Sequence, residues 1–137
     1  MQKISIGRSV AGFVIAAVVV IGAQSLANAQ QAGVERKVLL QQDLTMPGYQ
    51  AVLVAVTIPV GGREGRHSHP GTVLVHVQEG ALTLDHDGRP TVTYKAGESL
   101  FVEPGKVHEG INRGNTPVKA IATFIVEKGK PLTTQVQ

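Results

Sequence analysis

Short stretches of alternating apolar and polar residues, separated by glycine and proline, dominate the chain from residue 49 onwards. These stretches are rich in β-branched residues and too short for stable helices, so each is a predicted strand. Asp87-Gly88 lies between two such stretches and favours a hairpin turn. Many short strands joined by turns predict an all-β sandwich or barrel. The main predicted strands are 49–59, 72–77, 81–85, 100–102 and 117–126.

The segment from Lys128 to Gln137 has no decisive pattern. It fits either an edge strand or a loose end, and the sequence leaves both open. Sustained helical periodicity is not found after the first 29 residues, which strengthens the all-β prediction.

The first 29 residues follow a different pattern. Two basic residues precede an apolar run from Val10 to Ala23, and Ala27-Asn28-Ala29 follows with small residues where a signal peptidase reads them. These features describe a secretory signal peptide, an apolar segment that is helical during export. The run is shorter than the roughly 20 residues that span a bilayer, although an uncleaved anchor is the alternative. We expect cleavage after Ala29, which separates a signal peptide (1–29) from one folded domain (30–137) in the periplasm or outside the cell.

Composition narrows the functional classes. The expected signal peptide holds two of the 13 Lys and Arg residues and none of the 10 acidic ones, so the remaining chain is almost neutral. A near-neutral domain with few aromatic residues argues against a nucleic-acid partner. The chain has no cysteine. Disulfides and a lipid-modified cysteine are therefore excluded, and the core or a bound metal must stabilise the domain. Contact with a membrane is expected only through the signal peptide during export.

Two neighbouring histidines are candidates for metal binding. His67 and His69 are two residues apart, so their side chains point to the same face of an extended strand. The valines at 73, 75 and 77 continue that face, which makes it apolar and interior. Buried imidazoles need polar partners, and a metal ion is one such partner. The H-x-H pair by itself fits two half-exposed loop histidines equally well.

A larger pattern joins this pair to a third histidine. The first motif of the cupin family is matched by Gly61, His67, His69 and Gly80, and the second by Gly97, Gly105, His108 and Asn112. The chain therefore resembles a small single-domain bacterial cupin of type 2, and the resemblance covers most of residues 30–137. It implies a jelly-roll β-barrel in which His67, His69 and His108 surround one divalent transition metal.

The chain departs from the family pattern at two positions. Val73 stands where the family usually has a glutamate ligand, and Glu103 stands where it usually has proline. Without the glutamate, at most three neutral imidazoles remain, and two or three coordination positions stay open to water or an anionic substrate. A degenerate cupin that binds no metal is the alternative.

Other side chains are weaker candidates. Glu103 is the best replacement for the missing carboxylate, although a solvent-facing position before the Pro104-Gly105 turn is the favoured interpretation. Strand parity places His76 on the outer face. His86 is expected in solvent at the tip of the hairpin. Tyr94 and Glu103 have the chemistry of proton donors, but no spacing brings them to the histidines.

The resemblance does not name a reaction, because one fold serves many functions. One hypothesis is a metal-dependent oxygenase, isomerase or lyase acting on a small molecule in the barrel. The others are a non-catalytic module that binds a small molecule or metal, and a structural protein without a site. The metal would be zinc, copper, iron, manganese or nickel. Affinity order favours copper or zinc, whereas oxygenase chemistry favours iron. A homodimer through an outer sheet face is expected by analogy with small cupins.

Overall fold

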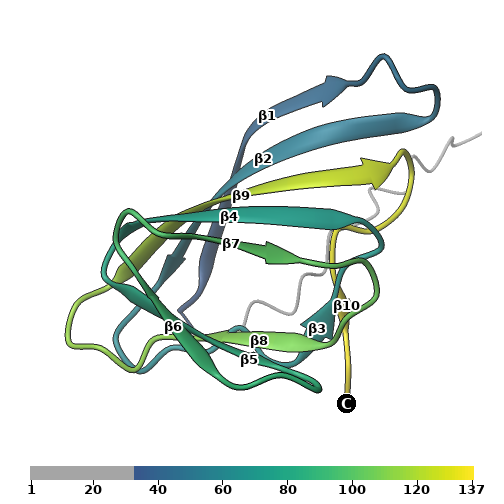
Figure 1. Cartoon of the computed structure of the whole chain (residues 1–137). Coiled ribbons are helices and arrows are strands. Elements are labelled where there is room, and N and C mark those ends of the chain that lie inside the picture. Colours follow the sequence, from purple (N-terminus) through teal and green to yellow (C-terminus); the bar gives the residue numbers. More distant parts are fainter. Residues whose placement is uncertain (1–32) are drawn as a thin grey trace, which may run out of the picture.

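A computed structural model describes residues 33–137, so the predicted signal peptide lies outside the described residues (Figure 1). Within residues 33–137 the secondary structure consists of ten strands. This part of the chain therefore contains no helix that is long and apolar enough to cross a membrane. The strands are β1 (Glu35–Asp43), β2 (Tyr49–Ile58), β3 (His67–Ser68), β4 (Thr72–Glu79), β5 (Ala81–His86), β6 (Val92–Lys95), β7 (Ser99–Val102), β8 (His108–Ile111), β9 (Val118–Glu127) and β10 (Thr134–Gln135).

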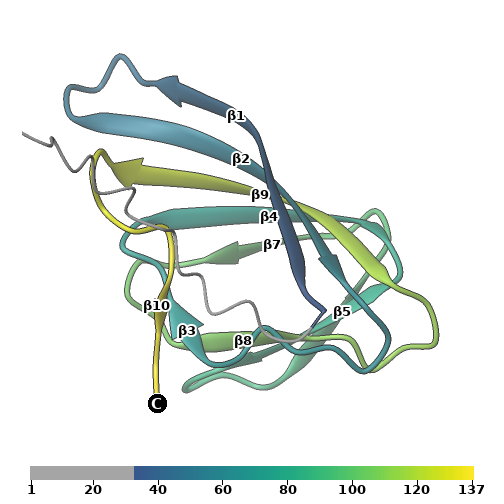
Figure 2. The same ribbon diagram turned by 180° about the vertical axis from the view of Figure 1, so that it is seen from behind.

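The strands form two five-stranded antiparallel sheets. The first sheet has the order β1-β2-β9-β4-β7, and the second has the order β10-β3-β8-β5-β6. The sheets lie one above the other and come together near β6, and the C-terminal segment with β10 runs across the opposite side (Figures 1 and 2). The predicted all-β jelly-roll fold is confirmed.

Alternating residues of the long strands build the core. Along β9 every second residue from Val118 to Val126 is buried, and the residues between them are more exposed. β2 pairs with β9 in register, with Val54 opposite Ala122 and Val52 opposite Phe124. These paired apolar side chains face the second sheet, which removes their surface from water and stabilises the fold.

The predicted strands correspond to β2, β4, β5, β7 and β9. The unpredicted β1 lies at the edge of the first sheet, and most of its residues are exposed. The open alternatives for the C-terminal segment are settled in favour of an edge strand, because β10 pairs with β3 at the edge of the second sheet. β1 and β10 bury little surface, so they lack the alternating pattern of a buried strand. The short strands β3 and β8 were not predicted either, although β8 is fully buried.

Candidate metal centre

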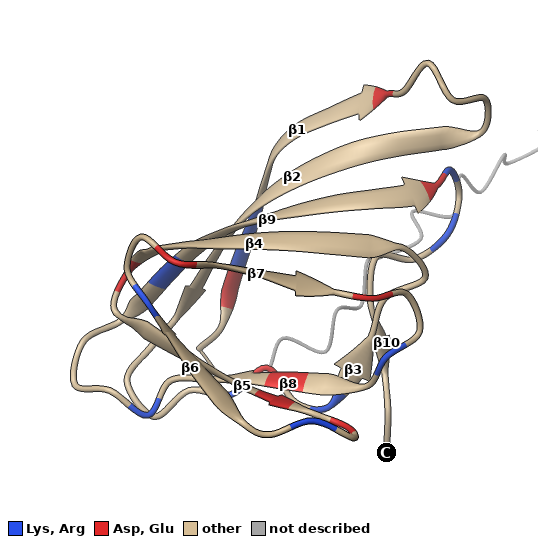
Figure 3. Ribbon diagram, in the orientation of Figure 1, with Lys and Arg blue, Asp and Glu red and all other residues tan. Residues whose placement is uncertain are grey.

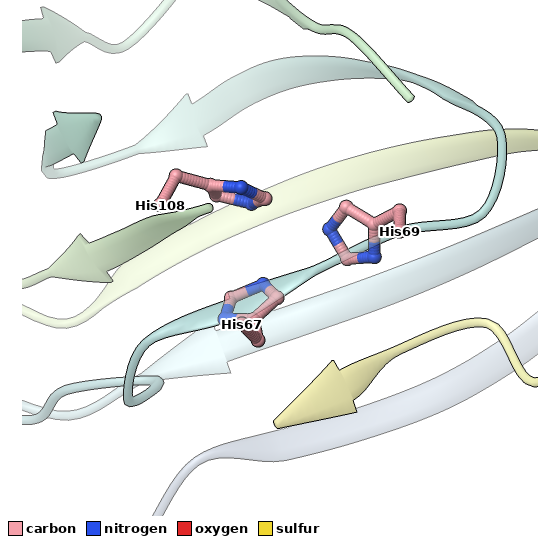
Figure 4. A group of neighbouring side chains, drawn as sticks. All are labelled: His67, His69 and His108. Carbon is pink, nitrogen blue, oxygen red and sulfur yellow. The ribbon is translucent and has the colours of Figure 1, made fainter. Parts of the chain in front are cut away.

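The structure brings His67, His69 and His108 together between the sheets. The ring centroids are 4.4 to 4.9 Å apart, and one ring nitrogen from each residue lies within 4.8 Å of the other two. All three residues are buried, with exposed fractions of 3%, 6% and 3%. In Figure 4 the three rings face a common space.

Strand pairing explains the convergence of the three rings. His67 lies directly opposite His108 in the antiparallel pair of β3 and β8. Residues that pair directly in a sheet point to the same face. His69 follows β3 and lies two residues after His67, which returns its side chain to that face. The site therefore combines a local spacing with one contact between distant segments.

Each ring is oriented by a hydrogen bond from its Nδ1 atom. His67, His69 and His108 donate to the main-chain carbonyls of Gly65, Leu132 and Lys106, at 2.7, 2.8 and 2.9 Å. A carbonyl oxygen only accepts, so these bonds place the proton on Nδ1 and leave the Nε2 lone pair available. Histidines that bind metals typically have such a partner on the second ring nitrogen.

The surroundings keep the three rings neutral. Burial lowers the pKa of His67, lowers the pKa of His69 to about 3 and lowers the pKa of His108 to about 4. The neighbouring His67 ring contributes to the lowering at the other two. Neutral imidazole is the form that binds metals, and it suits zinc, copper, iron and nickel. The tautomers, the neutrality and the convergence all fit a divalent transition metal.

The histidines open into a cavity of about 240 Å³ between the two sheets. Most of its wall is aliphatic, and the Phe124 ring packs edge-on against His69 with centroids 5.1 Å apart. Besides the histidines, the polar side chains that line it are Arg36, Glu64 and Thr133. Pro131, Leu132 and Thr133 form part of the wall. The C-terminal segment thus contributes both to the cavity and to the orientation of His69.

Val73 and Glu103 differ in their relation to the cavity. Val73 is 1% exposed and lines the wall, so the position of the usual glutamate ligand does face the site. Glu103 does not line the cavity; it forms an ion pair with Arg89, and its Oε2 lies 3.6 Å from Nε2 of His86. The Glu103 side chain is partly buried. Glu103 therefore does not replace the missing carboxylate.

The other two histidines lie outside the cluster. His76 is exposed, as predicted, and its Nδ1 bonds to the Ser99 hydroxyl at 2.9 Å. The prediction that His86 lies in solvent is wrong, because the residue is only 4% exposed. β5 extends to His86, which pairs directly with His108 on β8. The two rings stack with centroids 6.2 Å apart.

Sequence reasoning also missed Glu64, which lines the cavity although it lies three residues before His67. On a regular strand such residues face opposite sides. Here Arg63 pairs with Ile111 and His67 pairs with His108. Four steps on one chain therefore match three on the other, which is the signature of a β-bulge. Gly65 lies within the bulge with a φ of 73°. A glycine at this position is the sequence feature that could have indicated the bulge.

An ion pair on the outer side of β8 also fixes the segment before His67. Arg63 donates from Nε and Nη2 to the two carboxylate oxygens of Glu109, at 2.9 and 2.5 Å. This guanidinium keeps the pKa of Glu109 below its usual value. Glu109 is the acidic band that Figure 3 shows on β8. The ion pair and the bulge together set the position of the first histidine.

Comparisons with known proteins agree with this architecture. A family model described as a cupin domain matches residues 54–134, which include all three clustered histidines. An oxalate-binding protein of Thermotoga maritima is 30% identical over 69 residues, which are 50% of this chain and 57% of that protein. The chain thus spans little more than half the length of this relative.

Two solved structures share the fold. A cupin-like protein of Thermotoga maritima superposes with a TM-score of 0.63 at 21% identity, covering 75% of each chain. A predicted oxalate decarboxylase of the same organism superposes with a TM-score of 0.58 at 26% identity, covering 68% of this chain and 80% of the other. Since the family model matches more than half of the sequence, the chain belongs to the cupin family.

Proposed function

We propose that the protein binds a divalent transition metal through Nε2 of His67, His69 and His108, and that a small carboxylate in the cavity occupies the remaining coordination positions. The observation that carries this proposal is the set of three Nδ1–carbonyl bonds within a buried cluster. These bonds orient the rings and leave three neutral nitrogen donors close together, as a metal requires.

The ligand class follows from charge and size. Three neutral imidazoles leave the full positive charge of a divalent ion uncompensated, which favours an anionic ligand. A cavity of about 240 Å³ suits a molecule of a few heavy atoms. The relatives named for oxalate binding and oxalate decarboxylation support a small carboxylate.

When bound, the ion would act as a Lewis acid that polarises the oxygen atoms of its ligand. The protein would orient the ligand and keep bulk water away through its aliphatic wall. An oxygenase, isomerase or lyase would use this arrangement for turnover. A non-catalytic binding module is the second candidate, and the scarcity of acid or base groups among the lining residues favours it.

Metal content tests the proposal. Purified protein incubated with zinc and then desalted should retain about one ion per chain by mass spectrometry, whereas His67→Ala and His108→Ala should lose it. His76→Ala is the matched control, because this histidine is exposed and lies outside the cluster. Oxalate should bind the zinc-loaded protein in calorimetry and not the metal-free protein. Equal zinc content in all four proteins would refute the metal centre.

We also propose that the domain acts in the periplasm or outside the cell after cleavage at Ala29. The basic start, the apolar run and the A-x-A sequence support this proposal. Amino-terminal sequencing of the protein from an extracytoplasmic fraction should give Gln30 as the first residue. An intact Met1 terminus in that fraction would contradict cleavage.

A further inference from the structure

Arg36 and Glu64 form an ion pair in the wall of the cavity. Nη2 of Arg36 donates to Oε1 of Glu64 at 3.0 Å, and the two side chains are 22% and 16% exposed. Apart from the histidines, they are the ionisable side chains that line the cavity in the described chain. Glu64 is not one of the residues whose ligand atoms cluster closely enough to share an ion. The pair therefore belongs to the cavity wall and not to the metal cluster.

A glycine makes room for the Glu64 carboxylate. The Glu64 amide donates to the Gly110 carbonyl at 2.9 Å, which places the two residues side by side. A Cβ atom on Gly110 would lie 2.3 Å from Oε2 of Glu64 and 3.3 Å from Cδ1 of Leu82. The carboxylate thus occupies the space where any other residue at 110 would place its side chain.

This position brings the carboxylate near the histidines. Gly110 lies two residues after His108 on β8, so the two residues share the inner face of the strand. Glu64 and His108 both line the same cavity. Burial raises the pKa of the Glu64 carboxyl, and the Arg36 guanidinium that donates to it opposes this effect. A ligand of a few heavy atoms held at the histidines would therefore reach Glu64.

The ion pair determines which chemical group fits beside it. A carboxylate only accepts hydrogen bonds, and one oxygen of Glu64 already accepts from Arg36. The other oxygen suits a donor such as a hydroxyl group. On the Gly110 side, away from the oxygen that Arg36 contacts, a second carboxylate of the ligand would face Oε2 of Glu64 with no donor between the two acceptors. Repulsion between two carboxylates in a largely apolar wall is also stronger than in water.

We propose that Glu64 is a specificity-determining residue, which makes the cavity prefer small hydroxy acids over dicarboxylates. This inference rests on the proposed metal centre, because the ion would hold the shared carboxylate end of both ligands. Arg36 positions the Glu64 carboxylate from one side, and Gly110 leaves the space for it on the other.

Binding of two probes to the zinc-loaded protein tests this role. Glycolate and oxalate both have two carbons, but glycolate carries a hydroxyl group where oxalate carries a second carboxylate. Dissociation constants for both are measured by calorimetry at pH 7 for the wild type and Glu64→Gln. The glutamine keeps an oxygen that accepts from Arg36 and removes the negative charge. The affinity for oxalate relative to glycolate should rise by about tenfold.

Two further variants separate this role from general effects. Gly110→Ala keeps every charge but displaces the carboxylate, so it should shift the ratio in the same direction. Glu79→Gln removes the same charge from an exposed ion pair with Lys119 and should leave the ratio unchanged. Because each comparison uses the ratio of two ligands, differences in their intrinsic affinity for zinc cancel. Zinc content of each variant shows whether the site has folded.

The outcomes distinguish this inference from the proposed function. An unchanged ratio in Glu64→Gln and Gly110→Ala, or an equal shift in Glu79→Gln, would overturn the role of Glu64 and leave the metal centre intact. Zinc uptake without binding of either acid would overturn the proposed carboxylate ligand together with the role of Glu64, and would leave the metal centre intact. If Glu64→Gln retained no zinc, the ratio of the two affinities in Gly110→Ala would decide whether Glu64 determines specificity. Failure of the wild type to retain zinc would overturn the metal centre and this inference together.

Discussion

Replacing Asn112 with alanine should destabilise the domain by about 3 to 5 kcal/mol. The residue is fully buried. Its Nδ2 donates to the carbonyls of Ile58 and Thr116 at 3.0 and 2.9 Å, and its Oδ1 accepts from the Gly114 amide at 3.0 Å. A bond of this kind contributes roughly 1 to 1.5 kcal/mol. Alanine removes all three bonds and leaves a small cavity, which adds to the loss.

Urea unfolding followed by far-ultraviolet circular dichroism measures this loss, because the chain has no tryptophan for fluorescence. Asn112→Asp should be at least as damaging as alanine, since it places an oxygen opposite two carbonyl oxygens in a buried site. Asn115→Ala is the control, because Asn115 is an exposed neighbour in the same loop. A loss below about 1 kcal/mol for Asn112→Ala would refute the contribution assigned to these bonds.

Three further predictions concern a buried glycine, the C-terminal segment and the clustered histidines. Gly71→Ala should destabilise the domain by several kcal/mol in the same assay, since its Cβ would lie 2.1 Å from the Ile125 carbonyl; wild-type stability would contradict this packing. Truncation after Lys130 should weaken zinc binding by about 10- to 100-fold in competition with a chelating dye, because His69 loses its bond to Leu132; full-length affinity would refute that role. The clustered histidines have lowered pKa values, two of them about 3 and about 4, so in metal-free protein the unfolded state binds more protons below pH 6.5. Each histidine should lower the free energy of unfolding by up to about 1.4 kcal/mol per pH unit as the pH falls from 6.5 toward 4. In urea unfolding, the free energy of His69→Ala should therefore depend less steeply on pH than that of the wild type. An equal dependence on pH would contradict this origin.

The parts of the fold that the sequence predicted are those with strong local patterns. β2 and β9 are rich in apolar and β-branched residues, and their alternating burial reflects the face that each turns toward the second sheet. β1 and β10 lie at sheet edges and have no such pattern. His86 was misplaced for a related reason, since the hairpin signal at Asp87-Gly88 does not show that β5 remains paired with β8 up to His86.

For the site, the sequence alone determined that His67 and His69 share a face, since a spacing of two residues does so on any strand. The motif resemblance added His108. Tertiary structure decided the rest. The pairing of β3 with β8 places His108 beside His67, and the Leu132 carbonyl from the distant C-terminal segment orients His69. One extra residue in the bulge turns Glu64 into the cavity. These features depend on register between remote segments, and local periodicity carries no information about register.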